Sequence, residues 1–166
     1  HDYPAIGAIA DFVLLMTYEW GYTYSPPMAV APIDKVEAVV NYALTEIPAE
    51  KINMGVPNYG YDWPLPFIEG ESRARSLSNT AAVDLARRYR VEIMHDPVAM
   101  SPFFNYTSED GQRHEVWFED ATSIEAKLNL ATRENLRGVA IWNIMRYFPQ
   151  LWLVANGAWI IEDLPI

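Results

Sequence analysis

The chain has 166 residues, enough for one domain of roughly 100–200 residues but fewer than the about 250 of a complete eight-fold β/α barrel. It is 51% hydrophobic and 20% charged, as globular proteins are. The net charge of −10, with no basic cluster longer than Arg87-Arg88, argues against nucleic acid or a membrane surface as a partner.

No apolar run approaches the ~20 residues of a membrane-spanning helix, so membrane insertion is not expected. Cysteine is absent and the three histidines lack metal-ligand spacing, so we expect neither disulfides nor a metal site. The chain starts at His1 without a Met or a basic region. We therefore see no signal peptide and expect a mature or excised piece of a longer protein.

The first third of the sequence predicts a β/α repeat. Residues 3–10 are typical of the end of a helix, and the continuous apolar run 12–17 predicts a strand buried on both faces. Three prolines in 22–32 indicate a long surface loop. Apolar residues at helical spacing predict a helix over 33–44, and 52–56 predicts the next strand.

The pattern then changes to that of a small α+β insertion over residues 60–120. We expect an irregular segment at 63–66, a helix at 80–89 capped by Ser78 or Asn79, a strand at 91–95, and strands at 103–107 and 114–118 flanking the turn signal Asp110-Gly111. The sequence then returns to barrel-like elements.

Thr122 and Glu125 form a possible capping box for a helix ending near residue 134. A third buried strand is predicted over 138–144, and a short helix over 148–154. We therefore divide the chain into 1–59, with two β/α units, 60–120, the insertion, and 121–166, with the last barrel helix, a strand and the C-terminal helix.

Polar and aromatic residues stand where the three apolar strands end. Tyr18 and Glu19 follow the first, Asn58 and Tyr59 the second, and Trp142 lies in the third. The carboxyl ends of barrel strands meet at the face that carries the active site. A pyranose packs its C–H faces on aromatic rings and bonds its hydroxyls to polar groups, so this pattern favours a carbohydrate enzyme.

These segments resemble glycoside hydrolase family 18, the chitinase-like hydrolases. Met-Thr-Tyr-Glu at 16–19, Lys-Ile-Asn-Met-Gly-Val-Pro-Asn-Tyr-Gly at 51–60 and Gly-Val-Ala-Ile-Trp at 138–142 are similar to the family's sixth, seventh and eighth barrel strands. The segments 59–63, 101–104, 114–120 and 148–152 look like the spore-germination, cortex-lytic branch. The resemblance implies α/β architecture, with about strands 6–8 of a TIM (β/α)8 barrel and an α+β insertion.

The resemblance also implies a substrate-assisted cleavage of β-1,4-linked N-acetylglucosamine polymers, peptidoglycan of the spore cortex or chitin, with no cofactor. The family's catalytic string, Asp-x-x-Asp-x-Asp-x-Glu on the fourth strand, does not occur here. We therefore expect this chain to be the C-terminal part of the catalytic domain, inactive alone. A place in the cell envelope, in the spore or outside the cell follows from the resemblance alone.

By resemblance, Tyr18 holds the acetamido oxygen, Glu19 binds sugar hydroxyls or balances charge, and Trp142 forms the apolar floor. Further candidate substrate-binding residues are Met16, Trp20, Asn58, Tyr59, Tyr61 and Trp63. Plainer roles compete with several of these. Met16 suits core packing, and Tyr61 and Trp63 suit packing within a proline-rich loop.

Two other functions stay open. The chain could be a non-catalytic carbohydrate-binding or structural module, or a complete small enzyme using Glu19 with Glu119 or Asp120. The second needs two carboxylates about 5–9.5 Å apart, whereas Glu119 and Asp120 also suit capping of the helix that follows. Three barrel strands leave an apolar edge, so we expect a homodimer that covers it.

Overall fold

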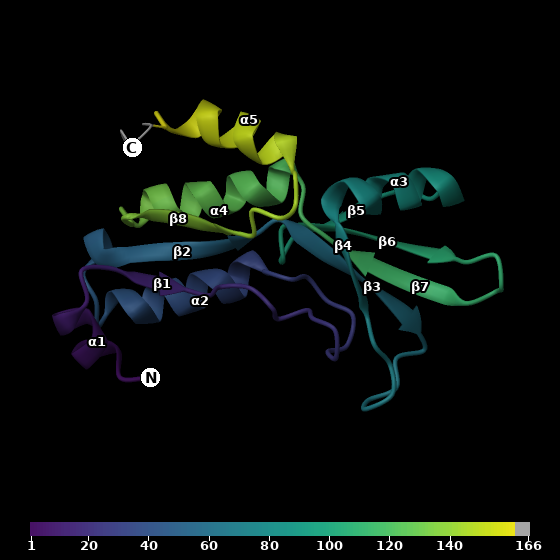
Figure 1. Cartoon of the computed structure of the whole chain (residues 1–166), viewed down its shortest axis with the longest axis horizontal. Helices are drawn as coiled ribbons and strands as arrows, with labels where there is room; N and C mark the ends of the chain where they lie inside the picture. Colours follow the sequence, from purple (N-terminus) through teal and green to yellow (C-terminus); the bar gives the residue numbers. More distant parts are fainter. Residues whose placement is uncertain (162–166) are drawn as a thin grey trace.

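Three parallel strands and their helices form one end of the molecule in the computed structural model, which describes residues 1–161 (Figure 1). The strands are β1 (Val13–Leu15), β2 (Ile52–Pro57) and β8 (Gly138–Trp142), in the order β1-β2-β8. Val13 lies opposite Ile52, and Pro57 lies opposite Trp142. Because all three run the same way, their carboxyl ends point toward the same part of the molecule.

Helices pack beside this sheet and bury its apolar residues. They are α1 (Tyr3–Ile9), α2 (Ile33–Leu44), α4 (Ala121–Arg133) and α5 (Pro149–Ala158), with a short 3-10 turn at Ala49–Lys51. Helix α4 contacts α2, α5, β2 and β8. The core between them is aliphatic and includes Ile52, Met54, Val36, Val40 and Leu128.

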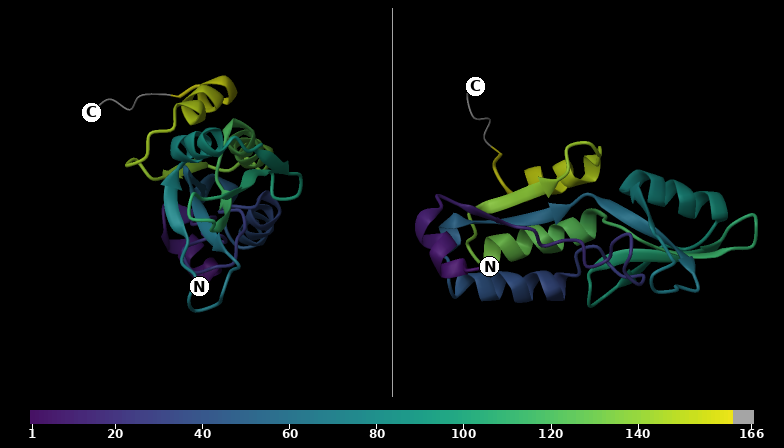
Figure 2. Two further views of the ribbon diagram at one scale, coloured as in Figure 1. Left: turned by 90° about the vertical axis from the view of Figure 1, so that its right-hand side faces the viewer. Right: turned by 60° about the horizontal axis from the view of Figure 1, so that its bottom comes forward.

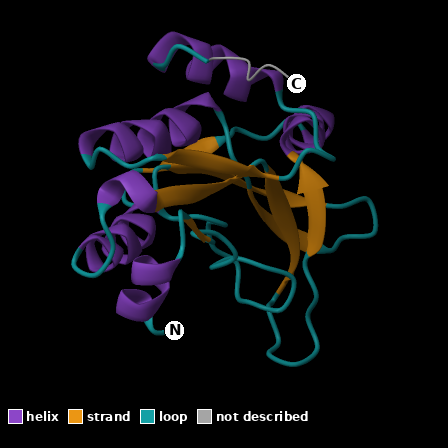
Figure 3. Cartoon of the chain, turned by 60° about the vertical axis from the view of Figure 1, so that its left-hand side comes forward, coloured by secondary structure: helices purple, strands orange, loops and turns teal. Residues whose placement is uncertain are grey.

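An antiparallel sheet with one helix forms the other end of the molecule (Figure 2). Its strands, in the order β4-β3-β7-β6-β5, are β3 (Tyr59–Leu65), β4 (Arg75–Ser78), β5 (Met94–Asp96), β6 (Ser101–Thr107) and β7 (Arg113–Trp117); α3 (Asn79–Tyr89) packs on it. Only Asn58 separates β2 from β3, so the chain passes almost directly from one sheet into the other (Figure 3).

Most predicted elements are confirmed, with local corrections. The predicted irregular segment at 63–66 is wrong, because β3 continues to Leu65. Pairing with β4 ends at Asp62, so β3 has one neighbour at Pro64, where a proline is tolerated. The predicted strand at 91–95 is shifted to Met94–Asp96.

The first strand is shorter than predicted, Val13–Leu15 rather than 12–17. The capping box of α4 is formed by Asp120 and Ser123, not by Thr122 and Glu125. The division at residues 59 and 120 stays a prediction. No helix within residues 1–161 is long and apolar enough to cross a membrane.

Candidate active site

A pocket of about 250 Å³ lies at the carboxyl ends of the three parallel strands. Its lining residues come from the segment after β1, from the end of β8 and the loop after it, and from strands β3 and β4. They are Glu19, Tyr59, Tyr61, Ser76, Trp142, Asn143 and Arg146. The pocket therefore gathers four of the predicted site residues: Glu19, Tyr59, Tyr61 and Trp142.

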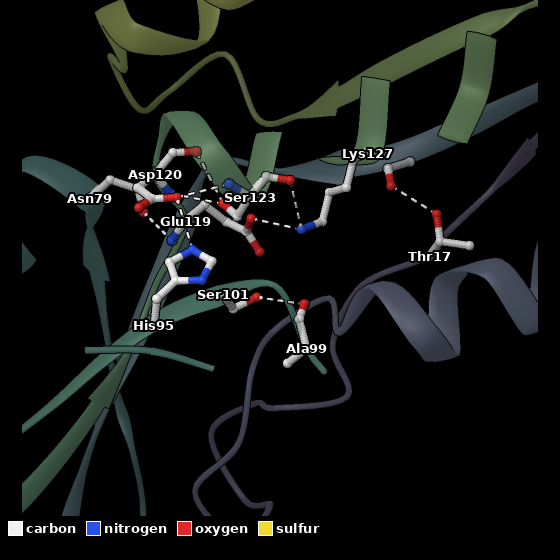
Figure 4. Close-up of polar contacts among 10 residues, drawn as sticks. Thr17, Asn79, His95, Ala99, Ser101, Glu119, Asp120, Ser123 and Lys127 are labelled. Carbon is white, nitrogen blue, oxygen red and sulfur yellow. Dashed lines mark hydrogen bonds and ion pairs between the residues drawn. The ribbon is translucent and has the colours of Figure 1, made fainter. Parts of the chain in front are cut away.

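Tyr18 stacks against Trp142 beside this pocket. The two ring centroids are 6.4 Å apart and the rings are 15° from parallel, while Trp142 keeps 52% of its surface exposed. A Cβ at Gly55 would lie 2.7 Å from the Tyr18 ring, so the glycine lets the ring approach β2. Thr17 fixes the turn before Tyr18 by donating to the Gly55 carbonyl at 2.8 Å (Figure 4). The result is an exposed indole face beside a phenol.

Glu19 is held by two tyrosines. Its carboxylate accepts hydrogen bonds from the Tyr59 hydroxyl at 2.5 Å and from the Tyr61 hydroxyl at 3.0 Å. Burial, and then Glu19 itself, raise the pKa of both hydroxyls above the ordinary value, which keeps them protonated as donors. Burial and the neighbouring Glu19 also raise the pKa of Tyr18. Glu19 adopts a left-handed backbone with φ of 68°, unusual for a residue other than glycine.

Asn58 supports the site rather than lining its floor. The side chain is buried, and its amide donates to the carbonyls of Asn143 and Arg146 at 2.8 and 2.9 Å. Its oxygen accepts from the Asn143 backbone N–H at 2.8 Å. Asn58 thus fastens the loop after Trp142, whose peptide bond with Asn143 is cis. The prediction of direct sugar contact for Asn58 is not supported, since its polar atoms already have partners.

Three predicted residues lie away from the pocket. Trp63 is fully buried, and its Nε1 donates to the Ser25 carbonyl at 2.7 Å, so a sugar cannot reach it. Trp20 is partly buried and packs against the aliphatic core. Met16 is 72% exposed, which excludes core packing within residues 1–161, and it lines a different pocket beside β1. Trp63 therefore offers no exposed surface to a sugar in this structure, whereas direct sugar contact stays a prediction for Trp20 and Met16.

Glu119 and Asp120 both stabilise the fold, one through a buried ion pair and the other as a helix cap (Figure 4). Glu119 is fully buried and forms a 2.8 Å ion pair with the equally buried Lys127, while its backbone N–H donates to Asn79. Asp120 caps α4 by accepting from the Ser123 N–H at 2.8 Å. Both line another pocket than Glu19 does. A carboxylate pair of Glu19 with Glu119 or Asp120 is therefore wrong for this arrangement.

Arg146 and Ser76 also line the candidate pocket, and the sequence analysis missed them. The Arg146 guanidinium lies 5.6 Å from the Tyr59 ring centroid and donates to the Ser76 hydroxyl at 3.0 Å. Arg146 comes four residues after Trp142, at the end of a barrel-like strand, which was the available signal. Ser76 gave none. Within residues 1–161, no cluster of three acidic or histidine side chains could hold a metal ion.

Comparison with known proteins decides the family. The model of glycosyl hydrolases family 18 matches residues 1–146. The chain belongs to this family. The family 18 match confirms the fold class predicted above, an α/β segment of the chitinase-like barrel.

Relatives within family 18 include enzymes of spores and chitinases. The chain is 53% identical over 156 residues to the cortical fragment-lytic enzyme of Bacillus subtilis, with 94% of this chain and 36% of that protein covered. The Bacillus cereus spore cortex-lytic enzyme SleL is 48% identical, with a TM-score of 0.95 and coverage of 98% and 37%. A chitinase from Chromobacterium violaceum is 31% identical, with a TM-score of 0.87 and coverage of 95% and 48%. The chain thus spans little more than a third of the length of the Bacillus subtilis enzyme.

Proposed function

We propose that this chain is part of a glycoside hydrolase that cleaves β-1,4-linked N-acetylglucosamine polymers, with spore-cortex peptidoglycan preferred to chitin. The observation that carries the proposal is the stack of Tyr18 on the half-exposed Trp142 beside a polar pocket. An exposed indole suits the C–H face of a pyranose, and the phenol suits its acetamido group. The names of the Bacillus relatives support the cortex as substrate.

The proposed reaction is substrate-assisted. An acidic side chain protonates the glycosidic oxygen, while the substrate's own acetamido oxygen attacks the anomeric carbon and displaces the leaving sugar. Water then opens the resulting oxazolinium ion. Tyr18 donates to the acetamido oxygen and orients it, and Trp142 supports the ring. The acid is assigned to a part of the barrel outside this chain, because the family's acidic string does not occur in these 166 residues.

Glu19 supports the site through its tyrosine partners. Because its oxygens accept from Tyr59 and Tyr61, the carboxylate fixes both rings and leaves one negative charge near the developing cation. Tyr59 and Tyr61 then form part of the wall of the pocket. In this role Glu19 acts as a charge-balancing and positioning group.

The assembly and location follow as parts of the same proposal. Strands β1 and β8 are the edges of the parallel sheet, and Phe12, Leu14 and Met16 beside β1 are exposed. Such an edge needs a covering partner, which is a second copy when this chain is alone. The names of the Bacillus relatives support a place in the spore or the cell envelope.

The test compares this chain with a version extended upstream to the full barrel. Both are incubated with N-acetylglucosamine oligomers and cortex fragments, and the products are identified by mass spectrometry. The proposal expects cleavage by the extended protein alone, and a loss of about 100-fold in kcat for its Tyr18→Phe variant. Binding without cleavage by the extended protein would instead favour a non-catalytic carbohydrate-binding module.

A further inference from the structure

Arg146 is held through both its backbone and its side chain. Its carbonyl accepts from Asn58, its guanidinium stacks over Tyr59 with 5.6 Å to the ring centroid, and its Nη2 donates to Ser76 at 3.0 Å. Stacking and hydrogen bonding together restrict a side chain that is otherwise rich in rotamers. The guanidinium is therefore fixed at the wall of the pocket that also contains Glu19 and Trp142.

Among the described residues, this arginine also has no acidic partner. Acidic residues outnumber Lys and Arg 22 to 12 in the chain. Arg87 and Arg88 each pair with one carboxylate, and Arg133 pairs with two. Within residues 1–161, no carboxylate lies within ion-pair distance of the Arg146 guanidinium. Glu19 lines the same pocket, but its carboxylate accepts hydrogen bonds from the hydroxyls of two tyrosines instead. A guanidinium has five N–H donors, and Ser76 accounts for one.

We propose that Arg146 binds a carboxylate of the substrate and so selects an acidic amino-sugar polymer over a neutral one. The inference rests on the proposed function and names its substrate class. A polymer of N-acetylglucosamine offers neutral hydroxyl and acetamido groups, whereas a carboxylate accepts two parallel, charge-assisted bonds from a guanidinium. In peptidoglycan that carboxylate comes either from the lactyl ether of a muramic unit or from a stem peptide.

Glu19 opposes the binding of an acidic substrate and makes the selection depend on Arg146. Its negative charge lies in the same pocket and disfavours an acidic ligand unless a cation meets that ligand first. Loss of the guanidinium therefore removes an attraction and leaves the ligand facing the Glu19 charge. The effect is confined to acidic substrates, because neutral polymers feel neither interaction strongly.

The experiment measures kcat/KM of the full-barrel protein and its Arg146→Gln variant. One acidic substrate is glycan freed of peptides, with the lactyl carboxylate exposed. The other is glycan with stem peptides, in which the lactyl carboxyl is an amide and the peptide carboxylates remain. Each is compared with the same material after its carboxylates are converted to neutral methylamides, and with N-acetylglucosamine oligomers.

We expect Arg146→Gln to lower the ratio of kcat/KM for acidic over neutralised substrate by about 10- to 100-fold. The substrate that shows the drop identifies the source of the carboxylate, and Arg146→Lys restores part of the ratio. Arg137→Gln is the matched control, because Arg137 stacks on Phe12 at 5.2 Å at the opposite end of β8.

An equal loss on acidic and neutralised substrates would overturn the proposal and leave Arg146 as a positioning residue for Tyr59. An unchanged ratio for both acidic substrates would overturn it as well. In either case cleavage of N-acetylglucosamine oligomers by the wild-type protein continues, so the proposed function survives. A wild-type protein that cleaves none of these polymers would instead end the proposed function.

Discussion

Lys127 and Glu119 form an ion pair in the interior, with Nζ 2.8 Å from Oε2 and no exposed surface on either side chain. Glu119 follows β7, and Lys127 lies on α4, so the pair joins the antiparallel sheet to a helix of the barrel (Figure 4). Burial raises the pKa of the Glu119 carboxyl, and the nearby Lys127 ammonium opposes that rise. The ion pair is thus a buried charged connection between the two parts.

We expect Lys127→Met to lower the free energy of unfolding by about 3–5 kcal/mol, because it leaves a buried carboxyl without its cation. Urea denaturation measures the change. The double variant Glu119→Gln/Lys127→Met should recover most of the loss, since neither side chain then carries a charge. Arg133→Met is the surface control and should cost less than about 1 kcal/mol, because its pair with Glu37 is exposed. A double variant no more stable than the single one would contradict this account.

Gly55→Ala is expected to displace the Tyr18 ring, because the added methyl group occupies the space next to it. Its Cβ would lie 2.7 Å from both the Leu15 carbonyl oxygen and the Tyr18 ring, so the ring must shift and its stacking on Trp142 must change. We expect a stability loss of about 1–3 kcal/mol and a fall in kcat of the full-barrel protein. Circular dichroism and product assays measure the two effects.

The control for that change is Gly157→Ala in α5, where a Cβ meets no atom within 4 Å. It should raise stability by up to about 1 kcal/mol, since alanine favours the helix. Equal effects of the two substitutions would show that the contact of Gly55 with Tyr18 has no consequence.

Asn58→Leu should detach the loop that carries Trp142 and Arg146. The substitution leaves a backbone N–H and two carbonyls of the loop without their partner, at about 1–3 kcal/mol for each group that stays buried. We expect faster amide hydrogen exchange over residues 143–146 and a raised KM in the full-barrel protein. Exchange rates equal to those of the wild type would show that other contacts hold the loop.

Local signals predicted the elements, while contacts distant in sequence decided the details of the site. Helical spacing predicted α2, and the strand ends pointed to Glu19 and Trp142, which line one pocket in the structure. Asn58 looked like a sugar ligand because its partners lie 85 and 88 residues away. Trp63 looked accessible because its partner, Ser25, lies 38 residues away in another loop. Periodicity and turn chemistry carry no information on such pairs.

Arg146 was missed for a related reason. Its value as a site residue depends on Ser76, 70 residues earlier, and on Tyr59 beneath it. An arginine in a loop after a strand is otherwise an ordinary surface residue. The fold was easier to predict than the site because apolar periodicity is repeated along the chain, whereas each site contact occurs once.

The tyrosines around Glu19 should lose their hydroxyl protons only at a higher pH than an ordinary tyrosine does. Burial is the first cause that raises the pKa of Tyr18, Tyr59 and Tyr61, and also of Tyr106, whose hydroxyl donates to Asp62. Four of the 10 tyrosines of the chain should therefore remain protonated when the folded protein passes through pH 10. Absorbance at the wavelength of tyrosinate measures the fraction that has ionised.

Because the pKa values of these tyrosines are raised in the folded protein, the free energy of unfolding depends on pH in the alkaline range. A tyrosine whose folded pKa exceeds its unfolded value of 10.0 contributes stability that is complete below pH 10 and is lost as the pH rises. Above pH 10 the unfolded state releases protons that folded Tyr59 keeps, at about 1.4 kcal/mol per pH unit for one group. Tyr59→Phe should make the decline shallower by that amount in urea denaturation at successive pH values. An unchanged slope would show that Tyr59 ionises freely in the folded protein and does not donate to Glu19.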